Sequence, residues 1–200
     1  MNKLLNIYFN SIRPGSYLFP SISIVFLTPA LYVQDQLNFG LTFYSIFTFY
    51  VLYYLGSQWN TYLDYITGVD NSKSDDKTLF GVMSLGELKI AMALSVIINY
   101  ISIGVLYFYL KFIELQSERF GTIVLINTLL IIVNLLYTPL KYIVIGQFSI
   151  SLTSYVFTLL ITYINSGVFS FFDSNDPIPC YSLLFHFSYH HWHLQIVLEI

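Results

Sequence analysis

The chain has 200 residues, of which 56% are hydrophobic, 19% are aromatic and only 10% are charged. Together with a mean hydropathy of +0.67, this composition excludes an ordinary soluble domain and predicts an integral membrane protein. The formal net charge of −3 says little about partners, and no nucleic-acid partner is expected beside the lipid bilayer. The single cysteine, Cys180, excludes an intramolecular disulfide.

The N-terminal segment, residues 1–12, predicts a short amphipathic helix at the membrane surface. Its apolar side would carry Leu4, Leu5, Tyr8, Phe9 and Ile12. Arg13 and Pro14 would end this helix, because proline cannot continue a helical hydrogen-bond ladder. The segment does not have the pattern of a cleaved signal peptide, so the first membrane helix is expected to target the chain.

Five stretches are long and apolar enough to cross a bilayer. They are residues 17–33, 39–59, 86–110, 120–136 and about 148–168, with loops at 111–119 and 137–146. We therefore predict an all-α integral membrane bundle of about five transmembrane helices.

Basic residues in the predicted loops are distributed unevenly between the two sides of the membrane. One side receives Lys3, Arg13, Lys73, Lys77, Lys89 and Lys141, and the other receives Lys111 and Arg119. The positive-inside rule then predicts that the N-terminus and the loop after the second span face the cytosol.

A polar stretch, residues 59–79, follows the second span and holds four aspartates and two lysines. Asn60 and Asp64 are four residues apart, so on a helix they share one face and can present two oxygen ligands to one cation. Gly68 offers a place for the helix to stop. Amide and carboxylate oxygens suit Mg²⁺ bound together with substrate phosphates, and Lys73 and Lys77 would suit the same phosphates.

This stretch resembles the first aspartate-rich motif of the UbiA superfamily of membrane prenyltransferases, and it is closest to the menaquinone and vitamin K branch. The pattern Asn-(Asp/Thr)-Tyr-x-Asp-x-x-x-Gly-(Ile/Val)-Asp is matched by Asn60, Thr61, Tyr62, Asp64, Gly68, Val69 and Asp70. The continuation Lys73, Ser74, Asp75, Asp76, Thr78, Leu79 is similar to the animal-type enzymes. Thr61 stands where many members carry a second aspartate, which removes one possible ligand.

A second segment, Tyr137-Thr138-Pro139-Leu140-Lys141-Tyr142, resembles the family's loop after the fourth helix, with Pro139 where glycine is common. The resemblance implies that Lys141 contacts a phosphate and that Tyr137 lines the acceptor pocket. The alternative is an interfacial lysine beside a tyrosine of the aromatic belt.

The resemblance implies a Mg²⁺-dependent transferase that joins a polyprenyl diphosphate to an aromatic, naphthoquinone-type quinone precursor. Asn60, Asp64 and Asp70 would be the catalytic metal ligands, and Lys73, Lys77, Tyr137 and Lys141 would bind substrate. The competing hypotheses are a non-catalytic membrane remnant or pseudogene product, and a small transporter. The transporter is disfavoured because its ionisable groups would usually lie near the bilayer midplane.

Two further groups of polar residues have less specific meanings. Asn127 and Asn134 lie seven residues apart in the fourth span and predict interhelical hydrogen bonds. His186 and His190 have a spacing that suits zinc on a helix, but no further ligand pattern accompanies them, and zinc is disfavoured.

The family fold has nine helices and a second motif, Asn-Asn-x-Arg-Asp, which this chain lacks. We therefore expect residues 1–170 to correspond to the first part of a UbiA domain and residues 171–200 to be an atypical tail. Codon degeneracy permits a frame two nucleotides later, over His193 to Ile200, that encodes the Asn-x-x-Arg-Asp spacing. A frameshifted end is therefore one hypothesis, and it predicts that the 200-residue chain is inactive alone.

Overall fold

The computed structural model describes residues 3–12, 32, 38–70, 78–112, 118–141, 152–153, 156–157 and 159–165, and none of these residues lies in a β-strand. The helices are α1 (Lys3–Asn10), α3 (Phe39–Ile66), α4 (Leu85–Phe112) and α5 (Glu118–Leu140), with a short helical turn, η2 (Thr78–Val82), before α4. The predicted all-α membrane bundle is confirmed.

Within the described part of the chain, three helices are long and apolar enough to cross a membrane: α3, α4 and α5. They correspond to the second, third and fourth predicted spans. The first predicted span, 17–33, lies outside the described residues except for residue 32. Of the fifth, residues 152–153, 156–157 and 159–165 are described, and they are helical.

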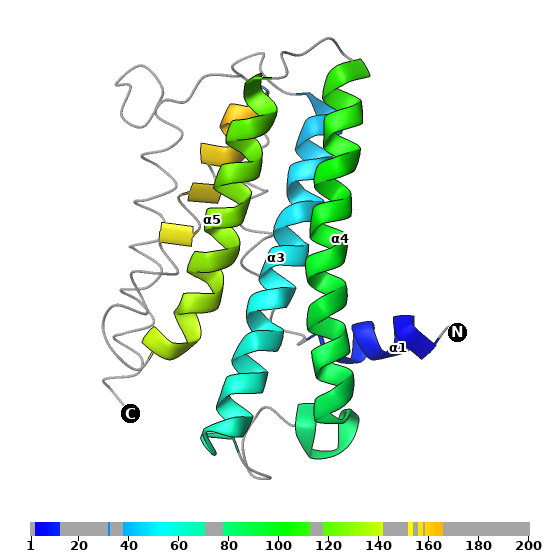
Figure 1. Ribbon diagram of the computed structural model, residues 1–200, viewed down its shortest axis with the longest axis vertical. Helices are drawn as coiled ribbons and strands as arrows, with labels where there is room; N and C mark the ends of the chain where they lie inside the picture. Colours follow the sequence, from blue (N-terminus) through cyan, green and yellow to red (C-terminus); the bar gives the residue numbers. More distant parts are fainter. Residues whose placement is uncertain are drawn as a thin grey trace.

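Helix α3 is the centre of the bundle, since it packs against both α4 and α5, which touch one another little. Figure 1 shows that α3 and α5 run in the same direction and that α4 runs in the opposite one. As a result, the C-terminal ends of α3 and α5 lie at one end of the bundle together with the start of α4. The residues near these ends can therefore form one site.

The packing between the helices combines apolar contacts with buried amides. Phe49 of α3 stacks on Phe157, with ring centroids 3.6 Å apart. Asn127 of α5 donates to Asn99 of α4 across 2.8 Å, and both side chains are buried. Asn134 donates to the carbonyl oxygen of Leu52, so both predicted interhelical asparagines make such bonds.

Gly56 makes the Asn134 contact possible. A Cβ at this position would collide with the side chain of Asn134. The missing side chain therefore lets α5 approach α3 closely, which is the usual role of small residues between membrane helices.

The N-terminal helix α1 lies across the same end of the bundle as the start of α4 (Figure 1). Buried Gln58 of α3 donates to Ser11 at 2.7 Å and accepts from Ser95 of α4 at 2.9 Å, which ties α1 to both spans. Burial raises the pKa of Tyr8, whose hydroxyl faces Ser95. Tyr8 therefore turns inward rather than sharing the outer side with Leu4, Leu5 and Phe9, which are exposed.

Helix α3 continues past the predicted membrane span to Ile66 and ends just before Gly68, whose φ is +74°, as the sequence predicted. One helix boundary differs from the sequence-based prediction. Helix α5 continues to Leu140, so residues 137–140, predicted as loop, are helical even though they include Pro139. Helix α5 continues past the predicted start of this loop because Trp59 of α3 donates to the carbonyl oxygen of Leu135, a contact that lies beside the candidate site.

Candidate functional site

Two polar side chains of α3 and one from the turn after α5 meet at the end of the bundle. The Lys141 ammonium lies 2.5 Å from Asp64 Oδ2 and donates to Asn60 Oδ1 at 2.8 Å. Asn60 in turn donates from Nδ2 to Asp64 Oδ2 at 3.0 Å. Asp64 is only 5% exposed, and Lys141 lies in the turn that directly follows α5. Residues 77 positions apart in the chain therefore form one compact charged cluster.

The helical repeat explains half of this geometry. Since Asn60 and Asp64 are separated by four residues in α3, both side chains share one face of the helix, as predicted, and both contact Lys141 at the end of α5. The other half depends on α5, which must end at the level of Asn60 and Asp64 for Lys141 to reach them. Because α5 runs in the same direction as α3, its last turn brings Lys141 to the level of Asn60 and Asp64 (Figure 1).

Trp59 explains why α5 extends far enough to place Lys141. Proline has no backbone N–H, so Pro139 cannot donate to the carbonyl four residues earlier, that of Leu135. The Trp59 indole N–H donates to this same carbonyl at 2.9 Å. The indole thereby replaces the missing helical donor and ties the last turns of α5 to α3 beside the cluster.

The turn after α3 brings Asp70 back toward the cluster through its backbone. The amide N–H of Asp70 donates to the carbonyl oxygen of Asp64 at 3.1 Å, in the turn that Gly68 permits. The Asp70 side chain is half-buried. The contacts that join Asn60, Asp64 and Lys141 do not include the Asp70 carboxylate, so its role as a ligand stays a prediction.

The remaining predicted substrate-binding residues have different outcomes. Lys73 and Lys77 lie outside the described residues, as do the four histidines of the tail. Tyr137 is half-buried in α5, one turn before Lys141. Lys89, which the sequence placed near the interface, holds its ammonium 5.6 Å from the centre of the Tyr62 ring, and Tyr62 stacks on Trp59.

The oxygen atoms of the cluster suit a magnesium ion that is bound together with a substrate. Among the described residues, no three His, Cys, Asp or Glu side chains gather in a way that could hold a metal by themselves. The cluster offers one carboxylate and one amide oxygen, and Mg²⁺ usually takes one or two protein carboxylates and completes its shell with water and phosphate. Asn60 and Asp64 are therefore suited to bind an ion together with a substrate, rather than to enclose it with protein ligands alone.

Two residues of this region were not singled out by the sequence. Trp59 has no motif of its own, but Pro139 inside a helical segment was a usable signal, since it implies an unpaired carbonyl nearby. Thr138 is 2% exposed, and its hydroxyl has no hydrogen-bond partner among the described residues. Nothing in the sequence pattern marks this hydroxyl as unpaired.

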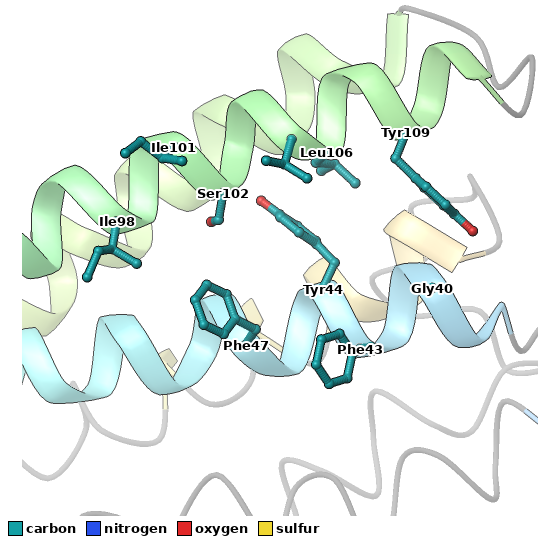
Figure 2. Close-up of a pocket in the computed structure, with 10 residues that line it drawn as sticks. Gly40, Phe43, Tyr44, Phe47, Ile98, Ile101, Ser102, Leu106 and Tyr109 are labelled. Atoms are coloured by element: carbon teal, nitrogen blue, oxygen red, sulfur yellow. The ribbon is translucent and has the colours of Figure 1, made fainter.

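A separate apolar groove of about 360 Å³ lies between α3 and α4. Figure 2 shows Tyr44 of α3 reaching toward Ser102 and Leu106 of α4, and Tyr109 of α4 extending toward Gly40 of α3. Phe47 of α3 also lines the groove. Phe47 and Asn60 are 13 residues apart on α3, which corresponds to about 20 Å along the axis. The groove also lies on the α4 side of α3, whereas Asn60 and Asp64 face α5, so it is not an extension of the charged cluster.

Comparison with known proteins found no family model, no curated protein and no solved structure that matches this chain.

Proposed function

We propose that the cluster of Asn60, Asp64 and Lys141 binds the diphosphate group of a polyprenyl diphosphate, together with Mg²⁺, at the end of a membrane helix bundle. The chain would act as a membrane prenyltransferase that alkylates an aromatic, naphthoquinone-type acceptor. The observation that carries the proposal is the convergence of an amide, a carboxylate and an ammonium from two separate motifs.

The position of the cluster supports an amphipathic substrate. It lies at the terminal turns of α3 and α5, where a charged head group can approach from water while an attached apolar chain stays among the helices. A transporter would place its ionisable groups near the middle of the spans instead. Burying a charged pair without a function is costly, and ionisable groups within membrane segments therefore usually mark a functional site.

The charges of the cluster match those of the proposed ligand. In the present structure Lys141 neutralises Asp64. When bound, Mg²⁺ would supply Lewis acidity toward the leaving diphosphate, with Asn60 and Asp64 as its protein ligands. The Lys141 ammonium would then stabilise the negative charge that grows on the diphosphate as the prenyl C–O bond breaks.

The resemblance to UbiA enzymes supplies the expected chemistry of the acceptor. The diphosphate would leave with the bonding electron pair, a ring carbon of the acceptor would attack the allylic carbon, and the ring proton would pass to the released diphosphate. The apolar surroundings would protect the allylic cation from premature attack by water.

Replacement of Asp64 by asparagine tests the proposal. Asp64→Asn keeps the shape of the side chain and removes the ligand charge, so prenyl transfer should be lost while the protein still inserts into membranes. Transfer is measured in membranes supplied with Mg²⁺, a prenyl diphosphate and a naphthoquinone-type acceptor. Glu87→Gln is the matched control, because Glu87 caps α4 through Ser84 and lies outside the cluster. Normal transfer by Asp64→Asn would contradict the proposed role.

A further inference from the structure

The hydroxyl of Thr138 is an unexplained buried polar group next to the charged cluster. Thr138 is 2% exposed, and its Oγ1 atom has no hydrogen-bond partner among the residues that the structure describes. A buried hydroxyl without a partner is unfavourable, because it loses its hydrogen bonds to water and gains none in return. We therefore expect the Thr138 hydroxyl to have a function that offsets this cost.

Three other hydroxyls in the described spanning helices do not share this state. Ser45, Thr61 and Thr128 each donate to the carbonyl oxygen four residues earlier in their own helix, at 2.8, 3.2 and 2.8 Å. This local bond is the ordinary solution for Ser and Thr within a helix. Thr138 does not use it, although it also lies within a helix.

The position of Thr138 on α5 shows where its side chain lies. Asn134 and Thr138 are four residues apart in α5, so they share one face of the helix, and Lys141 follows Thr138 by three residues in the turn after α5. The first and last of them contact α3, through Leu52 and through Asn60 and Asp64. Thr138 therefore faces α3 between these contacts, one turn before the ammonium of Lys141.

We propose that Thr138 is a further ligand-binding residue, whose hydroxyl donates a hydrogen bond to an oxygen atom of the diphosphate held by Asn60, Asp64 and Lys141. The inference rests on the proposed function of this cluster and adds a residue to it. A hydroxyl that is left unpaired in the free protein is available for a phosphate oxygen, and the bond to a charged acceptor would be stronger than one to a carbonyl.

The test measures two properties of the same variants in the purified full-length chain. The first is the dissociation constant for inorganic diphosphate in the presence of Mg²⁺, and the second is the midpoint of thermal unfolding without ligand. The variants are Thr138→Val, which removes only the hydroxyl, Thr138→Ser, which keeps it, and Thr128→Val as the matched control on the same helix. Thr128 has its hydroxyl bonded to Val124.

For Thr138→Val we expect diphosphate affinity about tenfold weaker, equivalent to ~1.4 kcal/mol for one hydrogen bond to a charged group. Its unfolding midpoint should be equal to or above that of the parent chain, because an unpaired buried hydroxyl has been removed. Thr138→Ser and Thr128→Val should both retain the parent affinity.

Two results would overturn the inference. If the parent chain binds diphosphate and Thr138→Val binds it equally well, the hydroxyl is not a ligand contact. If Thr138→Val lowers the unfolding midpoint, the hydroxyl has a structural partner in the free protein. Failure of the proposed function is a separate outcome, since the parent chain itself would then show no Mg²⁺-dependent affinity for diphosphate.

Discussion

At the scale of single residues, Asp64 and Lys141 act as one unit. Their side chains are only 7% and 16% exposed, so neither charge is well solvated without the other. Asn60 bridges them by donating to the carboxylate and accepting from the ammonium. A neutral amide between two opposite charges keeps all three groups in one place, with oxygen atoms that suit a cation and an ammonium that suits a phosphate.

Removing the cation tests whether this unit is coupled. Lys141→Met keeps much of the side-chain volume but leaves the Asp64 carboxylate buried without this ammonium, so the free energy of unfolding should fall by about 3–5 kcal/mol. Adding Asp64→Asn to the same chain should recover most of the loss. The measurement is unfolding of the purified chain in detergent, with Lys111→Met, an exposed lysine at the other end of α4, as the control. Equal stability of the single and double variants would mean that the two charges are not coupled.

The sequence predicted part of this cluster for a clear physical reason. The face shared by Asn60 and Asp64 depends only on the helical repeat, and the position of the stop depends only on the backbone freedom of Gly68. Lys141 was predicted to contact a phosphate from a resemblance, but its pairing with Asp64 depends on the relative depth of two helices. Patterns within one helix do not carry that information.

At the scale of elements, the last turns of α5 depend on a donor from another helix. Pro139 removes the N–H that Leu135 would need, and Trp59 supplies one across the interface. Sequence reasoning placed a loop at residues 137–146, and proline usually ends or kinks a helix. The prediction was wrong because a tertiary contact satisfied the carbonyl that the proline leaves unpaired.

A double-mutant cycle tests this relation between Trp59 and Pro139. Trp59→Phe keeps an aromatic ring against Tyr62 but removes the indole N–H, so the unpaired Leu135 carbonyl should lower stability by about 1–3 kcal/mol. In a Pro139→Ala chain the backbone N–H of residue 139 can donate to Leu135 instead, and the same Trp59→Phe change should cost much less. Equal costs of Trp59→Phe in the two backgrounds, measured by unfolding midpoints, would show that the indole does not replace the missing donor.

At the scale of the whole molecule, the charged residues separate toward the two ends of the bundle. Lys3 of α1, Lys89 of α4 and Lys141, directly after α5, lie toward the end where α3 and α5 stop, whereas Lys111 and Arg119 lie near the opposite end (Figure 1). For these five residues the arrangement agrees with the predicted grouping, and Arg13, Lys73 and Lys77 lie outside the described residues. The orientation of the cluster toward the cytosol stays a prediction from the positive-inside rule.

The class of the fold was predictable because composition and span length leave few alternatives in a bilayer. The way in which α1 docks was not. The sequence suggested an apolar stripe that includes Tyr8, but the buried network of Ser11, Gln58 and Ser95 turns Tyr8 toward the bundle. A pattern of hydrophobicity does not predict buried polar contacts between segments that are distant in the sequence.

The central claim, that this end of the bundle is a diphosphate site, is tested most directly by equilibrium binding of a prenyl diphosphate to the purified chain in lipid nanodiscs. We expect binding of farnesyl diphosphate that requires Mg²⁺, is lost on chelation, is abolished in Asp64→Asn and is unchanged in Glu87→Gln. Farnesol, which has the same chain without the diphosphate, should not compete. Binding that is equally strong with and without Mg²⁺, or equally strong in the parent chain and in Asp64→Asn, would contradict the claim.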